Sequence, residues 1–306
     1  MDIIGKRYWF FGFSLLIIIP GLIALAMGGI KPGIDFSGGS LIEVQFNSGA
    51  APEPQAVRSV IATVVGDEVT VQSSGTAGAL VKLKPIDEST QQQILKALAD
   101  NFGALTVLQF ESVGPAVGSE VAKRAAGAVA LAAVAIAIYI TYAFRRVPNA
   151  FRFGVAAIFS LVHDVLVLLG LEALLGLFLG WEADALFLTA VLTVIGFSVH
   201  DTIVVFDRIR ENQLLHRRIP FETVVNHSIV QTLDRSINTT LTVLLTLFAM
   251  ALFGGVTTRH FIIILLIGMF SGTYSSVFNA AAILVVWENR EWQRWFRRRA
   301  PQSSAS

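Results

Sequence analysis

Residues 185–212 read ALFLTAVLTVIGFSVHDTIVVFDRIREN, and this stretch decides how the rest of the chain is interpreted. Its first part is an apolar run long enough to cross a bilayer, which takes about 20 residues in a helix. The run is interrupted near one end by His200 and Asp201, and it ends in a dense cluster of charged side chains. A carboxylate within the hydrocarbon costs about 3 kcal/mol on insertion scales, so Asp201 is by default a candidate functional residue.

The composition indicates a membrane protein with a modest soluble part. The chain is 54% hydrophobic and 15% charged, whereas soluble domains average about 25% charged residues. The net charge is +1 and there is no cysteine. The missing thiols exclude disulfides, zinc–thiolate sites, iron–sulfur clusters and thiol catalysis.

The apolar runs predict six membrane-spanning helices. The first run is too long for the core of a signal peptide and has no A-x-A cleavage site after it, so we expect it to remain as a helix. The six predicted spans are residues 8–28, 125–144, 153–174, 185–206, 237–253 and 261–287. Residues 1–28 therefore form an N-terminal segment with the first helix, 125–287 hold the other five helices, and 288–306 form a basic tail.

The short connecting segments predict the orientation. Lys and Arg side chains precede the first helix, lie between helices two and three and between helices four and five, and follow helix six. The short segments on the other side carry acidic residues and only one cation, Arg259. The positive-inside rule then places both termini in the cytoplasm and the first large loop on the periplasmic side. For the basic tail, contact with anionic lipid headgroups is the economical interpretation, and ribosome or nucleic-acid binding is the weaker alternative.

Residues 29–124 predict a small α+β domain between helices one and two. Strand-like runs at 40–46, 68–72, 79–84 and 105–110 are interleaved with helix-like periodicity at 52–65 and 87–102. The order β-α-β-β-α-β is typical of ferredoxin-like domains. The predicted fold is thus an α-helical membrane protein with six transmembrane helices and a ferredoxin-like periplasmic domain.

Two glycine-rich stretches bracket this domain and are candidate hinges, because glycine permits unusual backbone dihedrals and sharp bends. The alternative is that both are rigid linkers. Neither is followed by the lysine and helix of a phosphate-binding loop, which disfavours a nucleotide site. The candidate hinge residues are Gly33, Gly38, Gly39, Gly114, Pro115 and Gly118.

Four motifs together resemble one known family. They are GIDFSGG at 33–39, SVGPAVGSEV at 112–121, the pair His163–Asp164, and GFSVHDTIVVFDRIREN at 196–212. The chain is similar, over nearly its whole length, to the SecF side of the SecD/SecF family of bacterial protein-export membrane proteins, which itself resembles the RND superfamily. Phe197 and His200 depart from that pattern, in which Tyr and Asn are common.

The resemblance implies a subunit of the Sec pathway in the bacterial inner membrane. It implies pairing with a SecD-like subunit, work beside the SecYEG channel on an unfolded preprotein, and use of the proton-motive force to move the periplasmic domain. We expect no cofactor and no nucleic-acid partner. Whether sodium replaces protons is left open.

The resemblance also supports Asp201 and Arg235 as the proton-coupling residues. Burial favours the protonated form of an acid, and an adjacent cation favours the charged form. The hypothesis is that Asp201 and Arg235 pair in one state and that a proton displaces Arg235 in the other; the alternative is a static ion pair. Asp164 is either a second relay group or a structural acceptor, and His163 and His200 are either relays or packing residues.

Three functions remain in competition at this point. The leading one is a proton-coupled export subunit. A non-transporting scaffold of the translocase would need no ionisable residue at the depth of Asp201. An RND-like exporter of small molecules or lipids is disfavoured because a domain of fewer than about 100 residues leaves little room for a large cleft. An enzyme is disfavoured, since we find no catalytic constellation and no metal-ligand spacing.

Overall fold

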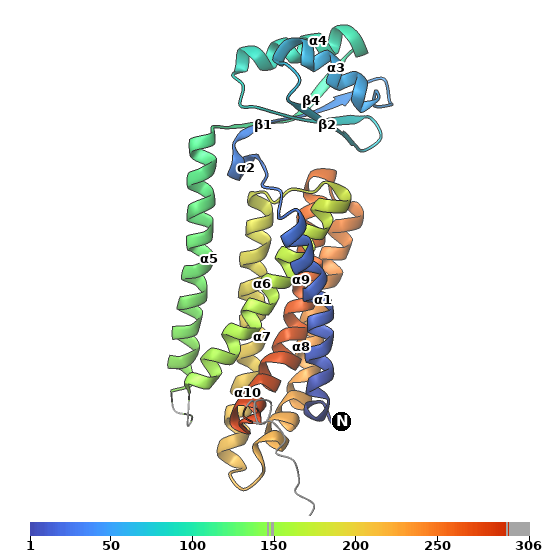
Figure 1. The fold of residues 1–306 in the computed structure, drawn as a ribbon. Helices are drawn as coiled ribbons and strands as arrows, with labels where there is room; N and C mark the ends of the chain where they lie inside the picture. The colour runs from blue at the N-terminus through green and yellow to red at the C-terminus, as the bar shows by residue number, and fades with distance from the viewer. Residues whose placement is uncertain (146, 148–149, 292, 294–306) are drawn as a thin grey trace, which may run out of the picture.

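The computed structural model describes residues 1–145, 147, 150–291 and 293, and it shows a helical bundle with a small sheet domain at one end (Figure 1). Most of the predicted basic tail, 288–306, lies outside the described residues. Within them, six helices are long and apolar enough to cross a membrane. The predicted fold class, six apolar helices and a small antiparallel sheet, is confirmed.

The membrane helices extend well past their apolar runs. They are α1 (Arg7–Met27), α5 (Pro115–Ala143), α6 (Phe151–Leu179), α7 (Ala185–Leu215), α8 (Phe221–Phe253), and a last helix made of α9 (Val256–Tyr274), η2 (Ser275–Ala280) and α10 (Ala281–Glu288). A short 3-10 turn, η1 (Ile4–Lys6), precedes α1. Residues 115–124, assigned from sequence to the domain, are the first turns of α5 because Pro115 suits the first position of a helix.

The last membrane helix contains an irregular segment that the sequence analysis did not anticipate. Residues of η2 form a π-helix between α9 and α10. Such segments insert an extra residue into the helical ladder and occur frequently at functional sites. The insertion turns Ser275, Ser276 and Asn279 into the bundle, where all three are buried.

The α/β domain, residues 39–113, is a four-stranded antiparallel sheet with two helices on one face (Figure 1). Its elements are β1 (Gly39–Phe46), α3 (Pro54–Val65), β2 (Val69–Ser74), β3 (Gly78–Leu83), α4 (Glu88–Phe102) and β4 (Leu105–Val113), and the strand order is β2-β3-β1-β4. The predicted order of elements is therefore present. The ferredoxin-like classification itself stays a prediction.

One face of the sheet packs on α3 and α4, and the other faces the membrane helices (Figure 1). Side chains alternate along a strand, so Ile42 and Val44 of β1 enter the core with Ile61 and Leu98 of the helices. Leu41 and its neighbours on the opposite face line a cavity above the bundle. The domain thus has its own apolar core and presents a mixed surface toward the membrane part.

The two glycine-rich stretches pack against each other where the domain meets the bundle. The first includes the short helix α2 (Ile34–Ser37) and ends in Gly38 and Gly39, whose φ values of 78° and 147° favour glycine. A Cβ on Gly38 would lie 2.7 Å from Cα of Pro115, and one on Gly118 would lie 2.8 Å from N of Gly38. These glycines permit close backbone contact, and the hinge role stays a prediction.

Candidate functional site

Asp201 lies inside the bundle. It is on α7 and is 2% exposed. Thr273 Oγ1 of α9 donates a hydrogen bond to Asp201 Oδ2 at 3.1 Å, and Thr240 of α8 lies 2.7 Å from Thr273. Because the single hydroxyl proton of Thr273 goes to Asp201, Thr240 is the donor to Thr273. Three helices therefore meet at this carboxyl group.

Arg235 and His200 lie on the outer surface of the chain. Both side chains are exposed, although α7 and α8 pack against each other. Within the described part of the chain, no ion pair joins Arg235 to Asp201. The structure therefore brings Asp201 into the bundle and leaves the predicted switching cation outside it.

Asp164, on α6, is fully buried and lies at the centre of a second polar cluster. Ser198 Oγ of α7 donates to Asp164 Oδ2 at 2.5 Å, and His163 Nδ1 lies 3.1 Å from Asp164 Oδ1. His163 Nε2 is 3.0 Å from Ser14 Oγ of α1, which also accepts from Asn279 Nδ2 at 2.7 Å. The predicted pair His163–Asp164 is thus held by α1, α7 and the π-helix together.

Small hydroxyl residues complete this cluster, and the sequence analysis missed them. Ser276 Oγ donates to the carbonyl oxygen of Ser198 at 2.8 Å and accepts from Thr202 Oγ1 at 2.9 Å. Ser160 donates to Ser275 at 3.0 Å. The run SGTYSS at 271–276, polar within an apolar helix, was the available signal. Hydroxyl groups are both donors and acceptors, so such a cluster can stabilise an acid in either protonation state.

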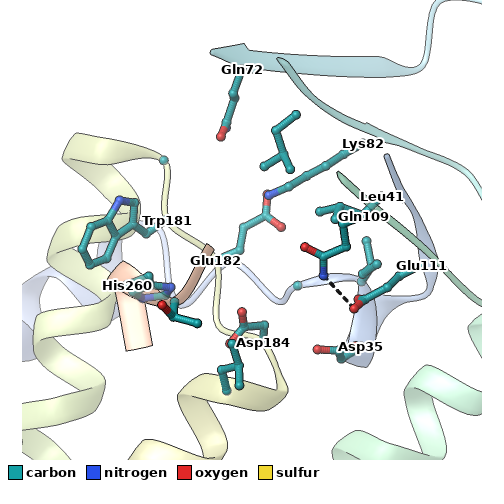
Figure 2. A pocket seen from close by; sticks show the side chains of 16 residues that line it. Asp35, Leu41, Gln72, Lys82, Gln109, Glu111, Trp181, Glu182, Asp184 and His260 are labelled. Atoms are coloured by element: carbon teal, nitrogen blue, oxygen red, sulfur yellow. Dashed lines mark hydrogen bonds and ion pairs between the residues drawn. The ribbon is translucent and has the colours of Figure 1, made fainter. Parts of the chain in front are cut away.

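A cavity of about 410 Å³ separates the α/β domain from the membrane helices (Figure 2). Lys82 of β3 crosses it and forms an ion pair of 2.8 Å with Glu182, in the loop between α6 and α7. Asp35 Oδ2, on α2, accepts a hydrogen bond from the backbone nitrogen of Ala185 at 2.7 Å. Backbone hydrogen bonds from Gly33 to Ala183 and from Ala183 to Lys31 lie beside it. The loop before α7 is therefore held by the segment that leads into the domain.

One wall of this cavity contains a buried acid–histidine pair. His260 Nε2 of α9 lies 2.9 Å from Glu172 Oε2 of α6, and the ring of Trp181 is 4.2 Å from the imidazole. The Glu172 side chain is 1% exposed and the His260 side chain 20%. Sequence reasoning missed this pair, because its members are 88 residues apart. Among the described residues, no group of three or more His, Cys, Asp or Glu is arranged to hold a metal ion.

The fold and these buried acids define a multi-pass membrane protein whose ionisable groups lie within its helix bundle. Residues 93–290 match the family described as "Protein export membrane protein SecD/SecF, C-terminal", and residues 23–50 match the SecD/SecF GG motif. The chain belongs to the SecD/SecF family of protein export membrane proteins.

Its relatives support this assignment over the full length. The chain is 52% identical to the protein translocase subunit SecF of Anaerolinea thermophila and 49% identical to that of Thermobaculum terrenum, with 100% of both chains covered in each case. The crystal structure of SecDF from Thermus thermophilus, a translocon-associated membrane protein, superposes with a TM-score of 0.83 at 33% identity. That match covers 95% of this chain and 39% of the longer SecDF chain.

Proposed function

We propose that this chain is a proton-coupled subunit of the protein-export machinery. In this proposal the proton-motive force drives protonation and deprotonation of Asp201, and the resulting helix movement is passed to the α/β domain, which promotes export of an unfolded preprotein. The domain lies on the periplasmic side of the inner membrane and both termini lie in the cytoplasm. The positive-inside pattern of the short loops supports this orientation.

The observation that carries the proposal is a continuous connection between the buried acid and the domain. Asp201 is on α7, and the first residue of α7, Ala185, is hydrogen-bonded to Asp35. Asp35 lies four residues before β1 begins at Gly39. A helix is a stiff element, so a rotation or shift of α7 at Asp201 is transmitted to its first turn and from there to the domain.

The surroundings of Asp201 support a two-state mechanism. A charged carboxylate buried in the bilayer without a cation costs about 3 kcal/mol on insertion scales. Burial without a neighbouring cation suits a protonated Asp201, which receives one hydrogen bond, from Thr273. In this proposal the described arrangement is the proton-loaded state. In the released state, Arg235 turns inward and pairs with the Asp201 carboxylate. Asp164, with its four-element hydrogen-bond cluster, is a second proton site in the same path, and His200 modulates the release from outside the bundle.

The remaining partners follow from what this chain leaves uncovered. The SecDF chain of Thermus thermophilus contains a SecF-like part that this chain matches, together with a larger remainder. We propose a SecD-like subunit in the place of that remainder, and the SecYEG channel as the site of action. The exposed side chains of Arg235 and His200 and the sparsely covered helix α5 are the surfaces such a subunit would cover.

Export into sealed inverted vesicles with an imposed proton gradient tests the proposal. Asp201→Asn and Arg235→Met should each remove the gradient-dependent part of export while the protein remains in the membrane. The matched control is Asp207→Asn, because Asp207 is on the same helix but is exposed and paired with Arg210. Full gradient-dependent export in Asp201→Asn would leave a scaffold as the function.

A further inference from the structure

The pair Glu172–His260 has properties that a purely structural pair would not need. Glu172 Oε1 is buried and has no hydrogen-bond partner among the described residues. A buried carboxylate oxygen without a donor has lost its contacts with water and gained no hydrogen bond in exchange, which is more unfavourable when the group is charged. That cost is smaller for a neutral carboxyl group than for a carboxylate.

The imidazole of His260 separates Glu172 from the cavity. His260 lines the cavity while Glu172, behind it, does not, and Figure 2 shows His260 beside Trp181 at the cavity wall. Among the described residues, the imidazole forms one hydrogen bond, between Nε2 and Glu172. The imidazole therefore offers a direct route for a proton from the cavity to the carboxylate.

We infer that Glu172 and His260 form a proton-binding site on the domain side of the membrane, through which the aqueous cavity exchanges protons with the helix bundle. A proton from water binds Nδ1 of the neutral imidazole, and the proton on Nε2 passes to Glu172 Oε2. The pair then holds a neutral carboxylic acid and a neutral imidazole with its proton on Nδ1. One proton is gained, the charge of the pair changes from −1 to 0, and no heavy atom has to move.

The position of the pair connects the cavity to the acids deeper in the bundle. Glu172 is on α6, eight residues from Asp164, which is roughly 12 Å along a helix. It is therefore placed between the cavity and the Asp164 cluster. This assignment rests on the proposed function, which requires protons to reach the bundle from the domain side.

Other charged groups near the pair have their own partners or are solvated. The domain-side halves of α1, α7 and α8 carry no ionisable side chain. At the exposed start of α5, Glu120 pairs with Arg124 beside Lys123. Arg259, next to His260 on α9, is exposed. The charged groups around the cavity are Asp35, Lys82, Glu111, Glu182 and Asp184. Of these, Lys82 is paired with Glu182, Asp35 and Asp184 accept hydrogen bonds from backbone nitrogens of α7, and Glu111 accepts one from Gln109.

Nitrogen-15 NMR of the histidine rings in the full chain, reconstituted in nanodiscs, tests this site directly. The chain has five histidines, and His260→Gln identifies the signals of His260 by their loss. The His260 nitrogens should report a change of tautomer or charge with pH. In Glu172→Gln, the midpoint of that change should move to lower pH by about one unit or more, because the neutral amide no longer supports the proton. Glu182→Gln, at the same cavity but paired with Lys82, should move it less.

His260 nitrogens that do not titrate, or that titrate identically in Glu172→Gln, would overturn the inference. Export measured against the pH of the domain-side compartment gives the second arm: Glu172→Gln should shift this pH dependence, and an unchanged dependence would also overturn the inference. The experiments distinguish failure of the Glu172–His260 site from failure of the proposed function. The NMR arm needs no translocase, whereas full gradient-dependent export in Asp201→Asn would overturn the proposed function alone.

Discussion

Asp35 and Ala185 connect the α/β domain to the helix that carries the buried acid: Asp35 Oδ2 accepts a hydrogen bond from the backbone nitrogen of Ala185 at 2.7 Å. Asp184 Oδ1 accepts a second one from the nitrogen of Phe187. The first turn of α7 therefore has two carboxylates on backbone N–H groups that the helix itself leaves free. One of these carboxylates belongs to the segment that leads into the domain, so a hydrogen bond joins the start of α7 to that segment.

We predict that Asp35→Ala weakens the coupling between α7 and the α/β domain more than it lowers the stability of the fold. Loss of one helix cap costs about 1 kcal/mol, which a bundle of this size tolerates, but the connection between α7 and the domain is broken. Gradient-dependent export should fall several-fold while the amount of protein in the membrane is unchanged. Asp35→Asn retains an acceptor oxygen and should keep most of the activity. An equal loss of gradient-dependent export in both variants would mean that export depends on the charge of Asp35 and not on its hydrogen bond to α7.

The ion pair Lys82–Glu182 should hold the domain close to the bundle in the state described. Because the chain has no cysteine, Lys82→Cys with Glu182→Cys introduces the only two thiols. A short bismaleimide should join them and stop gradient-dependent export if the domain must move. Each single cysteine variant treated with the same reagent is the control. Unimpaired export by the crosslinked protein would show that the two groups need not separate.

Glu291 binds the first turn of α1 at the end of the helix bundle that faces the cytoplasm in our proposed orientation. Burial by itself would raise the pKa of Glu291, but hydrogen bonds from Tyr8 and Arg7 outweigh it and lower the pKa below the ordinary 4.5. A lowered pKa means that the charged form stabilises the folded state, so this contribution is present above pH 4.5 and is lost as the pH falls through the lowered pKa.

Glu291→Gln should therefore reduce the free energy of unfolding at pH 7 by roughly 2 kcal/mol, the range of a hydrogen bond to a charged group. Thermal unfolding in detergent micelles should show the same difference at every pH well above 4.5 and a smaller one at more acidic pH. A difference that grows toward acid pH would contradict the assigned partners.

The crossing of α1 and α6 depends on two glycines. A Cβ on Gly170 would lie 2.7 Å from Cα of Gly21, and both atoms belong to rigid backbone. Small residues allow membrane helices to approach closely, so Gly170→Val should sharply lower the yield of folded protein in the membrane. Gly127→Val is the matched control, since nothing lies within 4 Å of a Cβ at that position. Normal yield of Gly170→Val would show that α1 can be displaced without loss.

The sequence predicts those features that depend on local pattern. The apolar run around Asp201 is long enough to require a membrane helix, and the alternation at 40–46 requires a strand with one buried face. Asp201 is buried as expected because the bundle has to shield its carboxyl group from lipid. The exposed position of Arg235 was not predictable, because a one-residue change in helix phase decides whether a side chain faces inward.

Contacts between distant segments could not be predicted from the sequence either. Glu172 and His260 lie on helices separated by the whole of α7 and α8, and neither position carries a local motif. The π-helix at 275–280 packs against α6 and α7, and this packing brings the Ser275 and Ser276 hydroxyls to Ser160 and Ser198. Tertiary packing, and not local propensity, assembled these parts of the site.

The central claim is that the protonation state of Asp201 sets the position of the α/β domain. Gln92→Cys on α4 and Leu214→Cys near the end of α7, both exposed, provide the only thiols for a pair of spin labels. The distance between the labels is measured in the complex purified from membranes, at several pH values, with and without Asp201→Asn. Two distances whose populations change with pH, and one pH-independent distance in Asp201→Asn, are expected. The same distance distribution in both proteins at every pH would contradict the account.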